Sequence, residues 1–159
     1  MIILGVDPGT ATTGYGVVKN SRGNSLECVS YNCITTQKEK GAGERLATLE
    51  KELLCVLNKY KPDAVAVERL YFFKNLKTVM PVSEARGVIL LAIAKKKLPV
   101  FEITPLQVKM AITGYGRADK KQVQRMVQQA LKLPEIPKPD DAADALGLAI
   151  AGVFLFKKR

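Results

Sequence analysis

The chain opens on Met1 and then the stretch Ile2-Ile3-Leu4-Gly5-Val6-Asp7-Pro8-Gly9. The apolar run before Asp7 predicts a short β-strand that is buried on both faces. The Asp-Pro-Gly sequence that follows is a strong turn signal, so the strand should end there. Asp7 is therefore predicted at the carboxyl end of a buried strand.

The rest of the chain predicts an α/β fold. Two further strands are expected directly after the first, and two later strands alternate with helices. A run of strands followed by such alternation implies a mixed five-stranded sheet with helices on both faces. We find no repeat and no linker, which predicts one domain over residues 1–156 and a short basic end at 157–159. The expected strands cover 2–6, 15–19, 26–35, 64–67 and 99–102, and the expected helices 43–58, 83–97, 105–112, 119–131 and 140–156.

The composition predicts a polyanionic partner and excludes several kinds of catalytic site. The 159 residues include 25 Lys and Arg, 15 Asp and Glu and no His, for a formal net charge of +10. Such a positive charge favours nucleic acid as a partner. The absence of His excludes Ser-His-Asp and Cys-His mechanisms and His-ligated zinc. Any acid or base chemistry must therefore come from other groups, chiefly carboxylates.

The cysteines and the apolar segments predict a cytoplasmic protein. Three cysteines, an odd number, favour a reducing compartment over a disulfide framework. Cys28 and Cys33 should lie on opposite faces of one regular strand, and Cys55 falls in an apolar helical stripe, so all three are predicted to be small buried hydrophobes. No apolar run approaches a membrane span, and the first residues lack the charged start of a signal peptide.

Two carboxylates are expected at strand ends, where open α/β sheets place their active sites. Asp7 follows the first strand, and Glu68 follows the strand at 64–67. Each residue alone also has a structural interpretation. Asp7 can stabilise the Asp-Pro-Gly turn through its side chain, and Glu68 can be a solvated residue at the strand exit.

Asp141 and Asp144 stand three residues apart, which places both carboxylates on one face of the last helix. Acids in a first turn stabilise a helix, and this accounts for Asp140 and in part for Asp141. It does not account for Asp144, whose helical face continues into Leu148 and Ala151, because a charge on an apolar stripe needs a cation or a donor. If the four acids converge, oxygen-only ligation favours two Mg²⁺ or Mn²⁺ ions, which can hydrolyse a phosphodiester without His.

Six blocks of the sequence closely resemble the RuvC family, the bacterial Holliday-junction resolvases. They run in the family's order over residues 2–155: IILGVDPGTATTGYGVV, AVAVERLYFFKN, SEARGVILLA, LPVFEITPLQVK, GYGRADKKQVQRMV and KLPEIPKPDDAADALGLAIA. The resemblance implies an RNase H-like fold and a metal site at Asp7, Glu68, Asp141 and Asp144, whereas Asp140 does not match the motif. It also implies a homodimer that uses Mg²⁺ or Mn²⁺ to nick two strands symmetrically, with the RuvA–RuvB branch-migration complex as a partner.

The expected DNA-binding residues lie in three segments. Residues 69–75 interleave aromatic and basic side chains beside Glu68, and Tyr71 matches a family aromatic that acts at the junction centre, where it can stack on unpaired bases. Lys109 and Lys120 match family lysines that serve DNA binding and cleavage, and Arg117 and Lys121 are additional candidates. The apolar pattern of the helix at 119–131 predicts that Lys120, Lys121 and Gln124 all face away from the core. The loop at 114–116 lacks the phosphate-binding glycine pattern, so no nucleotide cofactor is expected.

Together these features predict an Mg²⁺-dependent endonuclease that resolves four-way DNA junctions in recombination and repair. One alternative is an RNase H-like nuclease that acts on RNA or on RNA–DNA hybrids, although such an enzyme has no evident need for the segment after Glu68. The other is a junction-binding protein without catalysis, for which the four acids would be superfluous.

Overall fold

The first third of the chain forms an antiparallel meander in a computed structural model. The structure describes residues 1–9, 11–21, 25–69 and 76–156, and only the backbone of residues 76–78. Strand β1 (Ile2–Asp7) pairs antiparallel with β2 (Thr12–Asn20), and β2 pairs antiparallel with β3 (Leu26–Thr35). The three predicted strands are confirmed, with β2 beginning three residues earlier than expected.

Two parallel strands complete the sheet on the other side of β1. Strand β4 (Ala64–Glu68) runs parallel to β1, and β5 (Val100–Ile103) runs parallel to β4. The sheet order is β3-β2-β1-β4-β5, so the predicted mixed five-stranded sheet is confirmed. Strand β1 lies in the middle, and every residue from Ile3 to Val6 is buried.

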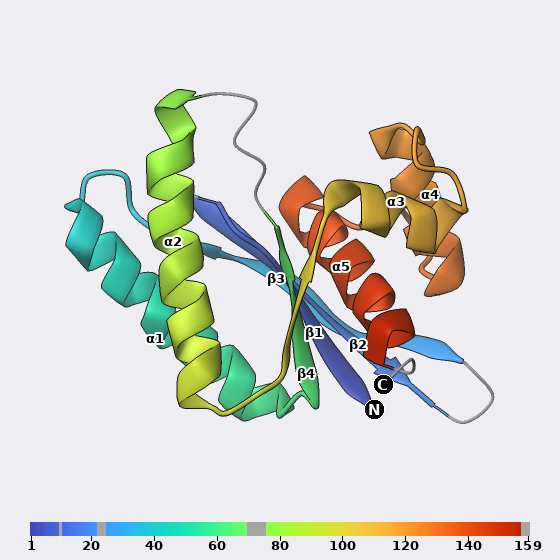
Figure 1. The fold of residues 1–159 in the computed structure, drawn as a ribbon, viewed down its shortest axis with the longest axis horizontal. Helices are drawn as coiled ribbons and strands as arrows, with labels where there is room; N and C mark the ends of the chain where they lie inside the picture. Colours follow the sequence, from blue (N-terminus) through green and yellow to red (C-terminus); the bar gives the residue numbers. More distant parts are fainter. Residues whose placement is uncertain (10, 22–24, 70–75, 157–159) are drawn as a thin grey trace.

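Helices cover both faces of the sheet, as the sequence predicts (Figure 1). The helices α1 (Ala42–Tyr60) and α2 (Leu76–Lys95) pack on one face around a core that includes Leu4, Val65 and Ile89. The opposite face carries α3 (Pro105–Thr113), α4 (Lys120–Ala130) and α5 (Asp140–Phe156). In α5 every residue from Ala145 to Val153 is buried, which is the pattern of a central helix.

Capping side chains explain where two of the helices begin. Asp119 accepts a hydrogen bond from the Gln122 amide at 2.8 Å, so its predicted role as the N-cap of α4 is confirmed. Thr104 caps α3 in the same way. Helix α2 begins at Leu76, seven residues before the predicted start at residue 83, and Pro81 lies inside it. The sequence placed this start too late because an interior proline disfavours a helix.

A β-bulge in β3 corrects the prediction for the cysteines. Val17 pairs with Ser30 and Val18 with Cys28, so Val29 is an extra residue in β3. This extra residue reverses the alternation of faces, and Cys28 and Cys33 therefore share the face that α5 covers. The prediction of opposite faces, which assumed a regular strand, is wrong. Both thiols are half-buried and Cys55 is exposed, so the prediction that all three are buried is wrong as well.

The described residues contain no helix that is both long enough and apolar enough to span a lipid bilayer.

Candidate active site

Two parallel strands bring Asp7 and Glu68 to the same edge of the sheet. Asp7 is the last residue of β1 and Glu68 the last residue of β4. The strands pair in parallel with Val6 opposite Val67, so these acids occupy neighbouring strand ends. This is the placement that the sequence predicts for both.

Glycines let α5 lie directly on the backbone of the sheet beside these strand ends. A Cβ at Gly5 would stand 2.0 Å from the carbonyl oxygen of Ala145, and a Cβ at Gly14 would stand 2.0 Å from that of Asp141. A Cβ at Gly16 would stand 2.7 Å from the amide nitrogen of Leu146. Because no side chain fits in these places, the first turns of α5 sit close to the ends of β1 and β4. The alternate glycines at 14 and 16, a signal that the sequence analysis passed over, mark this contact.

The four predicted acids form one electrostatic cluster around Asp7. Burial, and then the charges of Glu68, Asp144 and Asp141, raise the pKa of Asp7 to about 9. Burial also raises the pKa of Glu68, as does the charge of Asp144, while a hydrogen bond donated by protonated Asp7 acts in the opposite direction. Each shift reflects negative charge that lacks compensation in a partly buried place. A bound cation would supply that compensation.

Lys120 occupies the outer side of the cluster. Its Nζ lies 3.1 Å from a carboxylate oxygen of Asp144 and 3.1 Å from one of Asp140. Burial raises the pKa of Asp144, against the effect of Lys120. Burial alone would lower the pKa of Lys120, but the hydrogen bonds that it donates to Asp140 and Asp144, and the charges of these two carboxylates, raise it. The sequence predicted a cation or donor for Asp144, and in this structure Lys120 is that donor.

Helix α4 is rotated relative to the apolar pattern predicted from the sequence. Gln124 is buried rather than outward-facing, and its Nε2 donates to Asp140 at 3.3 Å. Lys120 lies one turn before Gln124 and reaches the first turns of α5, whereas Met126, predicted for the core, is 38% exposed. The prediction that Gln124 faces away from the core is wrong, whereas Lys120 is exposed as predicted and reaches the acids of α5 with its ammonium group. The polar partner that makes Gln124 an inward residue comes from α5, 16 positions away.

A pocket connects the acidic cluster with the second predicted lysine. Glu68, Lys109, Lys120 and Asp144 all line it, together with the apolar side chains of Pro105, Val108, Val123 and Leu148. Two lysines that the family resemblance assigns to DNA therefore flank two of the acids that it assigns to metal. Arg117 and Lys121 are exposed, and neither lines this pocket. Tyr71 lies outside the described residues.

The donor set suits a hard divalent cation, although its members do not already surround a single point. Carboxylate oxygens are the ligands that Mg²⁺ and Mn²⁺ prefer. Within the described ranges, no group of three or more Asp, Glu or Cys side chains is arranged to hold an ion as it stands. Lys120 lies against Asp144, where a cation's charge would act, and the raised pKa of Asp7 reflects negative charge that a cation would balance. The residues therefore fit such an ion, because they offer carboxylate oxygens as ligands and carry negative charge that is not balanced.

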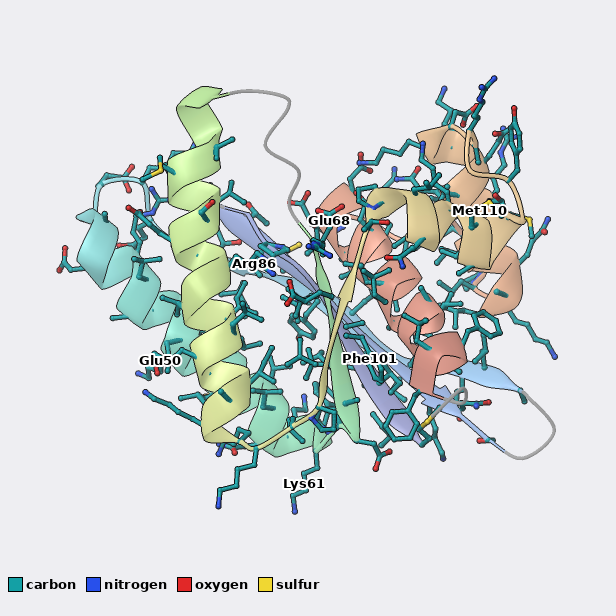
Figure 2. All side chains as sticks on the ribbon, viewed as in Figure 1. Glu50, Lys61, Glu68, Arg86, Phe101 and Met110 are labelled. Carbon is teal, nitrogen blue, oxygen red and sulfur yellow. The ribbon has the colours of Figure 1, made fainter. Side chains whose placement is uncertain are left out.

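Arg86, which the sequence analysis did not single out, connects α2 to the strand ends. Its Nε donates to the backbone carbonyl oxygen of Glu68 at 3.4 Å, and its guanidinium also pairs with the Glu102 carboxylate of β5. Figure 2 shows Arg86 reaching from α2 toward the end of β4, where Glu68 lies. Arg86 thus fixes the backbone that carries one of the four acids.

The chain is similar to proteins of a single family over nearly its whole length. Residues 3–152 match the family model described as "Crossover junction endodeoxyribonuclease RuvC". A protein of that name from Ruminiclostridium cellulolyticum is 54% identical over 150 residues, which cover 94% of this chain and 90% of the relative.

Solved structures show the same relationship. The Thermus thermophilus RuvC structure matches with a TM-score of 0.91 at 33% identity, over 99% of this chain and 96% of that one. T. thermophilus RuvC in complex with Holliday junction substrate matches with a TM-score of 0.90 at 31% identity and the same coverage. The fold is therefore RNase H-like, and the chain belongs to the RuvC family of crossover junction endodeoxyribonucleases.

Proposed function

We propose that this protein resolves Holliday junctions by hydrolysing phosphodiester bonds with Mg²⁺ or Mn²⁺, two ions per active site. The observation that carries the proposal is the meeting of Asp7, Glu68 and the acids of α5 next to a pocket with two lysines. This combination offers a place for cations beside a place for phosphate. Membership of the RuvC family supports junction DNA as the substrate.

Each group in the site has a distinct role in this proposal. Asp7, Glu68, Asp141 and Asp144 would hold the metal ions. Bound divalent ions supply the positive charge that activates a water nucleophile and stabilises the leaving 3′ oxygen. Close packing of α5 on the sheet keeps the acids of α5 near those of the strands, which is the pre-organisation that catalysis needs.

Basic groups around the pocket would hold the DNA. Lys109 and Lys120 would contact phosphates next to the scissile bond, because both line the pocket that Glu68 and Asp144 also line. Arg117 and Lys121 are exposed and would contact phosphates further along the strand. Tyr71 would stack on an unpaired base at the junction centre.

A homodimer is part of the proposal, because two symmetric cuts in one junction call for two sites related by a two-fold axis. The exposed face of α2 supports this assembly. Met80 is 67% exposed and Leu91 is 53% exposed. Gly87, exposed between them in sequence, has open space where a Cβ would be, as far as the described residues extend. We propose that this face of α2 forms the dimer interface. We also propose that the protein works in the cytoplasm with the RuvA–RuvB branch-migration complex as a partner.

The decisive experiment compares three labelled substrates: a four-way junction, a linear duplex and an RNA–DNA hybrid, each with Mg²⁺ and with EDTA. We expect paired, symmetric nicks in the junction that need the divalent ion. Asp7→Asn should abolish nicking and keep junction affinity in EDTA, since phosphate contacts supply most of the binding.

The matched control is Glu52→Gln, which removes the same charge from the exposed side of α1 on the opposite face of the sheet. This variant should nick the junction at the wild-type rate. Cleavage of the hybrid without junction nicks would favour the RNA-directed alternative. Junction binding without any cleavage would favour a structural role.

A further inference from the structure

Lys120 has two carboxylate partners, and only one of them belongs to the predicted metal site. Its Nζ lies 3.1 Å from Asp144 Oδ2 and 3.1 Å from Asp140 Oδ2. Asp140 does not match the family's acidic motif, and its side chain is 65% exposed. An exposed ion pair of this kind contributes little to stability, so its effect on the position of Lys120 matters more.

Gln124 fixes the orientation of Asp140. Its Nε2 donates to Asp140 Oδ1 at 3.3 Å, whereas the other oxygen, Oδ2, faces Lys120. Gln124 is 9% exposed and lies one turn after Lys120 on α4. The Asp140 carboxylate therefore contacts two side chains of α4, one with each oxygen, and this connects the start of α5 to α4. With one oxygen held by Gln124, the other sets the position of the Lys120 ammonium.

We propose that Asp140 and Gln124 are positioning residues that hold the Lys120 ammonium beside the metal site and draw it away from Asp144. This inference rests on the proposed function. A cation that takes Asp144 must displace the Lys120 charge from that carboxylate. With Asp140 in place, the ammonium keeps a partner at the edge of the pocket, where a DNA phosphate can reach it. Without Asp140, Lys120 is left with Asp144 and competes with the cation.

The first test measures Mn²⁺ binding without DNA, by the loss of the free-ion signal in electron paramagnetic resonance. We expect Asp140→Asn to weaken Mn²⁺ binding about three- to fivefold, the upper part of the range that an exposed ion pair provides. Lys120→Met should tighten Mn²⁺ binding. In the Lys120→Met background, Asp140→Asn should have no further effect, because the competing ammonium is gone.

Simple electrostatic attraction between Asp140 and the ion would give a different pattern. Asp140→Asn would then weaken Mn²⁺ binding equally in both backgrounds, and this result would overturn the proposal. Glu135→Gln removes the same charge from an exposed acid just before α5 and should leave Mn²⁺ binding unchanged. Asp140→Glu, which keeps a carboxylate in place, should restore most of the affinity.

The second test separates cleavage from binding on the four-way junction. Asp140→Asn should lower the single-turnover nicking rate about threefold and change junction affinity in EDTA by less than twofold. Gln124→Met should act in the same direction with a smaller effect. If Asp140→Asn matches the wild type in both Mn²⁺ binding and nicking, the inference fails while the proposed function stands. If the wild type does not nick junctions, the proposed function fails first, and the Mn²⁺ measurements still test the link between Asp140 and Lys120.

Discussion

Helix α5 can lie against the sheet only while residue 14 lacks a side chain, so Gly14→Ala tests how the site is positioned. The added Cβ would lie 2.0 Å from the Asp141 carbonyl oxygen and 3.0 Å from the Ala142 amide nitrogen. Ordinary contact for such a carbon starts at 3.4 Å, so the first turn of α5 must move away by about 1.4 Å. Both neighbouring atoms belong to the backbone, and no side-chain rotation can relieve the overlap.

The expected loss of stability follows from this displacement. Overpacking lowers the free energy of unfolding by about 1–3 kcal/mol. Alanine also restricts the unfolded chain more than glycine does, and this effect raises the free energy of unfolding by about 0.4–1 kcal/mol. We therefore expect the free energy of unfolding to fall by about 1–2 kcal/mol, measured by urea titration. A displacement of about 1 Å at a catalytic group can cost roughly 100-fold in rate, so junction nicking should fall by about that factor. Junction binding in EDTA should change little.

Gly43→Ala is the matched control, because a Cβ at Gly43 in α1 meets no atom within 4 Å in the part of the chain that the structure describes. Its free energy of unfolding should stay the same or rise by a few tenths of a kcal/mol. If Gly14→Ala unfolds at the same urea concentration as the wild type, the close contact does not position α5. If it loses stability but nicks at the wild-type rate, the placement of Asp141 is not critical for cleavage.

Three further predictions concern the acids and Arg86. The pKa of Asp7 is raised from 3.8 to about 9 in the folded state, so the folded protein binds a proton at Asp7 more tightly than the unfolded chain does. The stability that this proton contributes is lost as the pH rises from about 4 to about 9. In EDTA at pH 8, Asp7→Asn should therefore melt at a higher temperature than the wild type; an equal or lower melting temperature would contradict the buried, proton-binding role. Adding Mg²⁺ at pH 8 should raise the melting temperature of the wild type more than that of Asp7→Asn, and equal increases would place the ion elsewhere. Arg86→Ala should lower the free energy of unfolding by about 1 kcal/mol and slow nicking, whereas Arg86→Lys should keep the pairing with Glu102 and lose the Nε donor to the Glu68 carbonyl. Nicking at the wild-type rate in Arg86→Ala would show that this donor does not matter.

Much of the fold could be predicted from local patterns. The strand that ends at Asp7 and the strand that ends at Glu68 are short apolar runs followed by polar residues, and both lie where the sequence predicts them. The sheet is mixed because a meander precedes the alternating part of the chain. These features depend on neighbours in sequence, which a single sequence contains.

Several features that sequence analysis missed depend on partners from distant segments. Gln124 is inward-facing because Asp140, on another helix, accepts its hydrogen bond. The extra residue in β3 shows only in its pairing with β2, so Cys28 and Cys33 could not be assigned to one face beforehand. Arg86 reads as an ordinary basic residue of a helix until the strand ends that it contacts are in place.

The position of α5 in the sequence also sets when the acidic cluster can exist. Gly5 lies under Ala145, 140 residues later in the chain. At a synthesis rate of about 5–20 residues per second, the part of α5 that covers β1 is made roughly 7–28 seconds after β1 itself. Until then a nascent chain can pair β1 with β4 and bring Asp7 to Glu68, but it has neither Asp141 nor Asp144. The set of four predicted acids is therefore assembled only after the first turns of α5 have been made, so a chain that stops before Asp141 lacks two of the four.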